Sequence, residues 1–406
     1  MKTIKDSVHD HIEVSGVARD LLDTPAMQRL RRISQLGTVS LVYPSANHTR
    51  FEHSLGVYHL ATRALDNLEA DEHDRRRVEA AALLHDVGHS PHSHNTEGVL
   101  HRHTGKYHDE VHDLVDDGPV GEVLRANDLD PADIAGLVEG EGRYGAIVSG
   151  ELDVDRMDYL VRDAHHTGVP YGTIDHERLV RELTFVDGQL VLGEGNVETA
   201  ESLLVARALM TPAVYAHPAA RISKSMLRRA VERLIDAGAD PEAIRRWDDY
   251  RLRTALRDGP DTEETARRLD TRDLLKQAVR AEYDDTPDWL LEADYDELRD
   301  VERRIAERID VAPELVIVDV PSEPSMVESS TRVVVGGDIR RLDRQSPLVA
   351  ALEQANKSQW RMGVYAPRGT TEAAGEAAAA ELGLDIDGPL ISEVSGGLPP
   401  NLDVDG

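Results

Sequence analysis

The sequence predicts a mainly α-helical protein with a β-hairpin and a smaller α+β unit toward the C-terminus. Apolar residues such as Leu55, Tyr58 and Leu65 recur at helical spacing, and many segments before position 240 repeat this pattern. Between positions 185 and 192, β-forming residues flank an Asp-Gly pair, which is typical of a hairpin. After position 311, short strand-like runs alternate with helical ones. These three observations together favour this fold class.

Helix start signals and apolar spacing place the elements of the first part. Asp23, Thr24 and Pro25 favour a helix that runs toward Gly37, because Asp or Thr caps a helix and Pro fits its first turn. The same signals predict a short extended piece at 39–44, the hairpin at 185–192, and helices at 51–68, 74–86, 153–164, 196–213 and 218–237.

Composition divides the chain into four predicted parts. Residues 1–238 form a helical core, 239–310 a charged helical extension, 311–390 a small α+β domain, and 391–406 a flexible tail rich in Gly, Pro and Asp. In the third part we expect strands at 315–320, 331–335 and 360–365, and helices at 348–356 and 371–382.

The charge balance restricts the partners. The net charge is -30, with six lysines against about forty arginines, which resembles a halophilic archaeal cytoplasmic protein; an acidic mesophilic protein is the alternative. Nucleic-acid binding is disfavoured, because it needs basic surface to displace counterions. No run approaches the ~20 apolar residues of a membrane span, and the N-terminus lacks the apolar stretch of a signal peptide. We therefore expect a cytoplasmic protein with no membrane partner.

Three short segments carry residues typical of a metal site: NHTRFEHSLG at 47–56, ALLHDVGH at 82–89 and DVDRMDY at 153–159. His85 and Asp86, adjacent at the end of an apolar helix, would present two ligands at its polar end. One further His and one carboxylate would complete four ligands and leave open positions for water and a phosphate oxygen. The chain has no cysteine, so a mixed N/O site for Mn, Mg, Fe or Zn is expected. A lone His-Asp pair usually has no function, whereas the three segments in order indicate a metal site.

These segments resemble the H…HD…D signature of the HD phosphohydrolases. DTPAMQRLR at 23–31 and QLG at 35–37 resemble the dNTP triphosphohydrolase branch, which includes bacterial dGTPases and the mammalian SAM-and-HD-domain dNTPase. The resemblance is close over about 1–235 and returns over 316–367. It implies an HD-domain helical core and hydrolysis of dNTPs, with dGTP as the candidate preferred substrate, to deoxynucleoside and triphosphate. It also implies a divalent metal ion held by His53, His85, Asp86 and Asp155.

A row of polar residues indicates the substrate. Asp155, Tyr159 and Asp163 are four residues apart on one helix face and span about 12 Å, comparable to a triphosphate that continues into a sugar; a packed aromatic and an ion pair are the alternative. The resemblance implies further contacts to phosphate, sugar and base. The residues expected to bind the substrate are then Gln35, Arg50, Arg156, Tyr159, Asp163, Arg207 and Tyr215. Pro218 stands where the family more often has a phosphate-binding lysine, which puts triphosphate binding at this position in doubt.

The stretch from 89 to 112 is rich in histidine. A histidine with a pKa near neutrality can protonate a leaving alkoxide, so our hypothesis is that a metal-polarised water attacks the α-phosphorus while His94 protonates the 5′-oxygen. The resemblance gives supporting roles to His89, Glu97 and His108. We expect the remaining histidines of this stretch on the surface: His92, His101, His103 and His112.

Regulation and alternative functions stay open at this point. Asp23, Gln28 and Arg31 match residues that bind an activating guanine nucleotide in the mammalian relative, although a helix cap and a surface arginine explain them equally well. Activation would need a homo-oligomer, a dimer or a tetramer. The alternatives to a dNTPase are another HD phosphohydrolase, with a nucleoside monophosphate or (p)ppGpp-like substrate, and a nucleotide-sensing regulator with weak catalysis.

Overall fold

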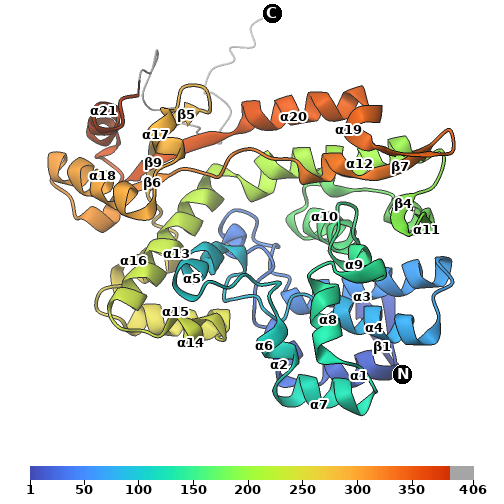
Figure 1. Ribbon diagram of the computed structural model, residues 1–406. Helices are drawn as coiled ribbons and strands as arrows, with labels where there is room; N and C mark the ends of the chain where they lie inside the picture. The colour runs from blue at the N-terminus through green and yellow to red at the C-terminus, as the bar shows by residue number, and fades with distance from the viewer. Residues whose placement is uncertain (385–406) are drawn as a thin grey trace, which may run out of the picture. The chain divides into compact units, whose positions relative to one another are not determined.

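The computed structural model describes residues 1–384 of the 406-residue chain, except the side chains at 327 and 328 (Figure 1). Packing divides the chain into two compact units. Among the described residues, the first unit contains 1–273 and 325–356, and the second contains 274–324 and 357–384. The predicted four-part division stays a prediction, and the predicted tail at 391–406 lies outside the described residues.

The first unit is mainly helical, as predicted. Its helices through α10 are α1 (Gly16–Leu22), α2 (Pro25–Leu30), α3 (Arg50–Asn67), α4 (Glu72–Leu84), α5 (His94–Thr104), α6 (His112–Val115), α7 (Gly118–Ala126), α8 (Pro131–Val138), α9 (Gly142–Val148) and α10 (Val154–Thr167). The later helices are α11 (His176–Arg181), α12 (Val197–Met210), α13 (Pro218–Asp236), α14 (Pro241–Arg245), α15 (Asp249–Asp258), α16 (Glu263–Asp270), α19 (Leu342–Gln345) and the start of α20 (Pro347–Gln359). Short helical turns lie at η1 (Val39–Leu41), η2 (Pro170–Gly172), η3 (Thr211–Tyr215) and η5 (Val327–Ser330).

Two small sheets belong to the first unit. Strands β1 (Lys2–Asp6) and β2 (Asp10–Val14) form an antiparallel hairpin. The predicted hairpin at 185–192 is confirmed as β3 (Leu183–Val186) and β4 (Gln189–Leu192). Its turn residues Asp187 and Gly188 both have positive φ, as a tight two-residue hairpin turn requires. Strands β7 (Arg332–Val335) and β8 (Asp338–Arg341) extend this sheet in the order β3-β4-β7-β8.

The second unit has the smaller α+β architecture that the predicted fold class includes, although residues 325–356 of the predicted 311–390 domain pack with the first unit. Its antiparallel sheet has the order β5-β9-β6, formed by β5 (Lys276–Glu282), β9 (Arg361–Ala366) and β6 (Ile317–Asp319). Helices α18 (Tyr295–Arg308) and α21 (Thr371–Leu382) pack against each other and bury apolar residues in the same core. The short α17 (Asp288–Leu291) and η4 (Pro313–Leu315) complete the unit.

Three local predictions were wrong, each because backbone pairing or packing overrode the local pattern. The helix at Pro25 ends at Leu30 and does not reach Gly37, because the backbone at 33–35 pairs with 48–50. The piece at 39–44 is not extended but contains the turn η1. The helical extension expected at 239–310 is interrupted by β5, where Val279 and Ala281 enter the apolar core.

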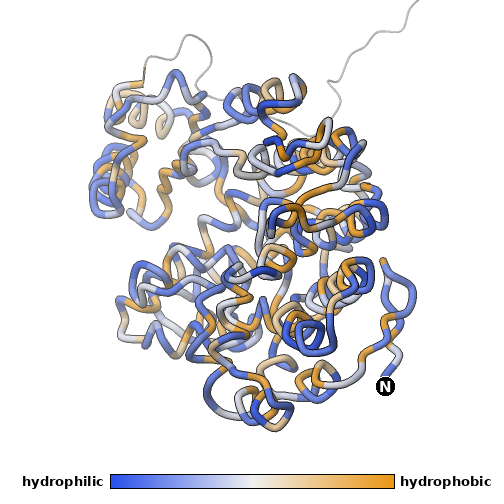
Figure 2. The backbone as a smooth tube through the Cα atoms, turned by 45° about the vertical axis from the view of Figure 1, so that its right-hand side comes forward, coloured by the Kyte–Doolittle hydropathy of each residue, from blue (hydrophilic) through white to orange (hydrophobic). Residues whose placement is uncertain are grey.

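The helices bury one apolar face each, and Figure 2 shows hydrophobic and hydrophilic residues alternating along them. Among the described residues, no helix combines the length and the apolar character that a bilayer crossing requires. In the first unit, α3 packs against both α4 and α10. Gly56 makes one of these approaches possible, because a Cβ atom there would collide with the carboxylate of Asp158 on α10. This contact brings together the helices that carry the predicted metal ligands.

Candidate metal centre and active site

The four predicted metal ligands converge from three helices of the first unit. His53 lies in α3, His85 and Asp86 follow the end of α4, and Asp155 lies in the first turn of α10. His53 Nε2 is 2.8 Å from Asp155 Oδ1 and 3.2 Å from His85 Nε2. Asp86 Oδ2 lies 3.7 Å from His53 Nε2, and Asp155 Oδ1 lies 3.9 Å from His85 Nε2. His53, His85 and Asp86 lie close enough together to hold one ion, and Asp155 contacts both imidazoles. Nitrogen and oxygen donors of this kind fit a divalent cation.

The far side of each imidazole fixes which nitrogen faces this centre. His53 Nδ1 donates to Asp158 Oδ2 at 2.8 Å, and His85 Nδ1 donates to the carbonyl of Ala82 at 2.9 Å. Both Nε2 atoms therefore face the centre, where they are available to bind a metal ion. A carboxylate or carbonyl behind a ligating histidine is the usual support of a metal site. Burial raises the pKa of Asp158, but the contacts with Arg162 and the histidines outweigh burial and hold this pKa well below its usual range.

Sequence reasoning missed the ion network behind His53. Arg162, which is fully buried, donates from Nε to Asp158 at 2.8 Å and from Nη1 to Asp6 at 2.9 Å. His9 Nε2 contacts the second oxygen of Asp158 at 2.6 Å. The signal in the sequence was the spacing of Asp155, Asp158 and Arg162 along one helix, whereas nothing local indicated Asp6 or His9.

We predict that Arg162→Leu lowers the free energy of unfolding by about 3–5 kcal/mol, because it leaves buried carboxylates without their cation. Urea unfolding of metal-free protein measures this change. Arg19→Ala, which removes an exposed pair with Asp20, is the control and should cost at most about 1 kcal/mol. Equal losses in the two variants would contradict the structural role of Arg162.

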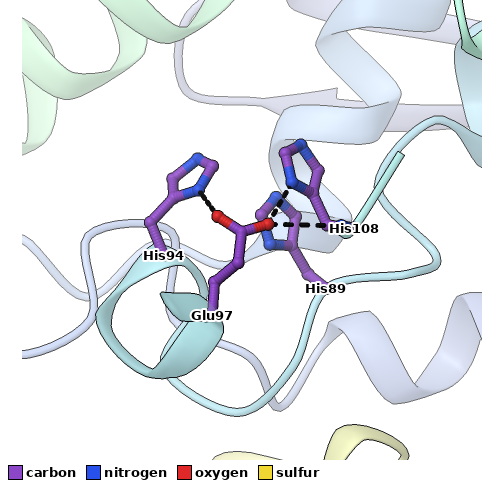
Figure 3. Close-up of side chains that lie close together, drawn as sticks. All are labelled: His89, His94, Glu97 and His108. Carbon is purple, nitrogen blue, oxygen red and sulfur yellow. Dashed lines mark hydrogen bonds and ion pairs between the residues drawn. The ribbon is translucent and has the colours of Figure 1, made fainter. Parts of the chain in front are cut away.

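The predicted catalytic residues form a second cluster (Figure 3). Glu97 accepts hydrogen bonds from His94 Nδ1 at 2.8 Å and from His108 Nδ1. The ring of His89 stacks on His108 with centroids 4.1 Å apart and lies edge-on to His94 at 4.8 Å. His89 Nε2 is 3.1 Å from Asp86 Oδ1. Asp86 therefore belongs to the metal centre and also contacts the histidine cluster.

Local backbone geometry assembles this cluster. Gly88 is required, because a Cβ atom there would collide with the carbonyl of His108. His92 and Ser93 have positive φ of 58° and 55°, a strained conformation for residues other than glycine. The turn starts α5 at His94, so that His94 and Glu97 share its first turn. The expectation that His92 is a surface residue was wrong: its side chain is buried under α15 and its backbone N–H donates to Asp249.

The Glu97–His108 pair depends on pH. Burial lowers the pKa of His108, but the contact with Glu97 outweighs burial and raises this pKa above the usual 6.5. Burial raises the pKa of Glu97, but the two histidines outweigh burial and hold this pKa below the usual 4.5. The charge on His108 therefore stabilises the folded protein at its full value below pH 6.5, and this stabilisation is lost as the pH rises through the higher pKa of the folded state. The charge on Glu97 stabilises the folded protein at its full value above pH 4.5, and this stabilisation is lost as the pH falls through the lower pKa of the folded state.

We predict that Glu97→Gln lowers the melting temperature of metal-free protein most between pH 4.5 and 6.5. The difference from the unaltered protein should shrink as the pH is raised toward 9, because His108 then loses its charge in both. Thermal unfolding across this range measures it. A difference that stays constant with pH would contradict the pairing.

The predicted substrate row is present on α10, but its far end already has partners. Asp163 accepts from Tyr215 Oη at 2.9 Å and contacts His48 Nε2 at 2.8 Å, a residue that the sequence did not single out. Burial raises the pKa of Tyr159 to about 12, so this phenol remains a hydrogen-bond donor. The Oε1 atom of Gln35 is buried and has no hydrogen-bond partner among the described residues, as expected of a group that awaits a ligand.

Two of the three predicted phosphate-binding arginines are held by acidic groups of the site. Arg50 donates from Nη1 to both oxygens of Asp86, at 2.9 and 3.1 Å, and from Nε to Ser93. Arg156 is bonded to Asp153, the carboxylate that caps α10. Arg207 lies on α12 close enough for its charge to lower the pKa of Tyr159 against the effect of burial. Arg50 thus orients a candidate metal ligand, Asp86.

The predicted regulatory trio has local partners. Asp23 pairs with Lys2 at 2.6 Å, and Gln28 donates to the carbonyl of Leu22. Arg31 donates to Gln28 and lies over the ring of Phe51 at 3.5 Å. Their role in nucleotide binding stays a prediction.

Two family models match the chain: an HD domain over residues 50–163 and an HD associated region over residues 174–393, more than half of the chain. The chain belongs to the HD domain family. The HD match contains all four candidate metal ligands. This HD domain protein is a metal-dependent hydrolase of the phosphohydrolase class.

Relatives of known sequence or structure agree with this family. The chain is 34% identical over 379 residues to the uncharacterized protein MJ1154 of Methanocaldococcus jannaschii, which is 91% of this chain and 80% of that one. It is 34% identical over 223 residues to the deoxynucleoside triphosphate triphosphohydrolase SAMHD1 of Homo sapiens, which is 45% of this chain but only 36% of that protein.

Solved structures extend the match across the chain. A hypothetical protein from Aquifex aeolicus matches with a TM-score of 0.76 and 30% identity, over 94% of this chain and 99% of that one. A phosphohydrolase from Bacteroides thetaiotaomicron matches with a TM-score of 0.74 and 25% identity, over 91% and 100% of the two chains.

Proposed function

We propose that this HD domain protein hydrolyses deoxynucleoside triphosphates to a deoxynucleoside and triphosphate, with dGTP as the candidate preferred substrate. Its divalent ion would be held by His53, His85, Asp86 and Asp155. The observation that carries the proposal is the position of Asp86, whose Oδ1 is 3.4 Å from His85 Nε2 and 3.1 Å from His89 Nε2. A set of metal-binding donors thus adjoins a cluster of histidines suited to proton transfer.

The residues of the second cluster suggest how the leaving group departs. As the oxygen of water bonds to the α-phosphorus and gives up a proton to solvent, the bond from that phosphorus to the 5′-oxygen breaks and its electron pair stays on the 5′-oxygen. His94 donates a proton from Nε2 to this oxygen, while its Nδ1–H bond to Glu97 orients the ring. A divalent ion bound at the first cluster supplies Lewis-acid activation of water and phosphate oxygens.

The substrate class rests on α10 and its neighbours. Tyr159 and Asp163 extend from the candidate ligand Asp155 along one helix face, and the half-buried Tyr215 and the buried Gln35 add polar groups. This arrangement suits a phosphate chain that leads into a sugar and base. Relatives named as dNTP triphosphohydrolases, including the human and Dictyostelium discoideum proteins, support the same class. An activating guanine nucleotide at Asp23, Gln28 and Arg31 and a homo-oligomer belong to this proposal as predictions.

The test is to incubate metal-loaded protein with each dNTP and NTP and to identify the products by ion-exchange chromatography and 31P NMR. We expect deoxynucleoside and triphosphate, and much less of both from Asp155→Asn protein at the same limiting metal concentration. In 18O-labelled water the label should enter the triphosphate, because water attacks phosphorus. Orthophosphate or pyrophosphate would indicate another HD phosphohydrolase, and absence of product would indicate a regulator; either result overturns the proposal.

A further inference from the structure

A cavity of about 170 Å³ lies in the first unit and is lined by none of the candidate metal, catalytic or substrate residues. Apolar side chains of α13, α15 and α16 form part of its wall. Its polar lining consists of Thr38, Ser40, His92, Arg253, Arg257 and Asp270. A cavity of this size holds several water molecules, so it has room for a phosphate group.

His92 is an unusual residue for this wall. Its side chain is 1% exposed, and its Nε2 accepts a hydrogen bond from Arg253 Nε at 3.4 Å. Arginine can only donate, so the proton of the neutral ring lies on Nδ1. Asp249 Oδ2 is 3.5 Å from that nitrogen, and the backbone of Gly37 lies beside the ring. A polar ring is costly to bury, and holding Arg253 in the cavity would explain its presence.

Arg253 shares the one carboxylate of the cavity lining with Arg257, and its charge helps to lower the pKa of that Asp270 carboxylate. Asp270, the one acidic residue of the lining, is bound by both Nε and Nη2 of Arg257 at 2.7 and 3.0 Å. The two Nη groups of Arg253 make no hydrogen bond or ion pair within the part of the chain that the structure describes. A guanidinium fork anchored at Nε presents the geometry that binds two oxygens of a phosphate.

We infer that this cavity binds a phosphate group, either free phosphate or the phosphate of a nucleotide, with Arg253 as its main ligand. The Ser40 hydroxyl lines the same cavity and is available as a further donor. The inference does not depend on the substrate proposed above, because the two sites share no residue.

The cavity wall also contacts the metal centre through a short chain of residues. His92 precedes Ser93, whose hydroxyl accepts from Arg50 Nε at 2.9 Å, and Arg50 in turn binds Asp86. Since His92 and Ser93 occupy a strained turn, a phosphate on Arg253 that shifts His92 would alter this support of a metal ligand. Coupling of this kind is reciprocal, so phosphate should change metal affinity.

The first experiment titrates inorganic phosphate into metal-free protein by calorimetry. All variants carry Arg207→Gln, which removes a phosphate contact of the proposed active site. We expect Arg253→Gln to weaken the remaining binding by about tenfold or more, and His92→Phe to weaken it as well. Arg251→Gln is the matched control, since Arg251 is on the same helix but lies over the Trp247 ring. Affinity that is equal in Arg253→Gln and Arg251→Gln overturns the inference.

Two further measurements sharpen the result. A titration with dGMP distinguishes the sources: binding tighter than that of phosphate and still dependent on Arg253 indicates a nucleotide, and equal binding indicates free phosphate. The affinity for Mn²⁺, measured by equilibrium competition with a chelator, tests the coupling. Phosphate should change this affinity in Arg207→Gln protein and leave it unchanged when Arg253→Gln is added. An affinity that phosphate never changes overturns the coupling.

Discussion

Replacing His94 by alanine should lower kcat by about 10²–10⁴-fold while the bound metal stays at the level of the unaltered protein. His94 Nδ1 is bound to Glu97, so Nε2 is the nitrogen available for proton transfer to the 5′-oxygen. The side chain is 52% exposed, and its loss should therefore cost little stability. Steady-state turnover with dGTP and metal analysis by mass spectrometry measure the two quantities.

The control for this variant lies on the same helix. His103→Ala removes an exposed histidine of α5 outside the cluster and should keep full turnover. A substrate with a better leaving group at the α-phosphorus, such as a p-nitrophenyl ester, should restore part of the rate to His94→Ala, because it needs no proton. Full activity of His94→Ala with dGTP would remove His94 from the mechanism.

The sequence was sufficient for the parts of the site that lie in local motifs. His85 and Asp86 are adjacent, and His94 and Glu97 share one helical turn, so their proximity follows from the chain itself. The convergence of α3, α4 and α10 could be predicted only through the family resemblance, because nothing in 47–56 alone indicates which helix packs against it. The hairpin at 183–192 was predictable from its Asp-Gly turn.

The missed features depend on residues far apart in the chain. Asp6 and Arg162 are 156 positions apart, and His48 and Asp163 are 115 apart, so only tertiary packing brings these partners together. The burial of His92 could not be predicted either, since its polar ring and loop position are typical of a surface residue. It is buried because a strained turn and the packing of α15 place it there.

Replacing Asp155 by asparagine should lower the affinity for the divalent ion by more than about 100-fold, and with it the turnover at low metal concentration. The affinity should fall because the change removes one of the two carboxylate charges among the candidate ligands. The fold should survive because the Asp155 side chain is 34% exposed. Asp153→Asn is the matched control, because Asp153 caps the same helix and asparagine caps equally well. Metal titration of the two variants measures the difference, and equal affinities would exclude Asp155 as a ligand.

The Asp155→Asn and His94→Ala variants should also respond differently to added metal. Excess Mn²⁺ should restore part of the turnover of Asp155→Asn, because its defect lies in the occupancy of the site. The same addition should leave His94→Ala unchanged, because its site is already full and the missing group is the proton donor. Restoration of both variants would mean that His94 acts on metal binding, and the two clusters that meet at Asp86 would then form a single metal site.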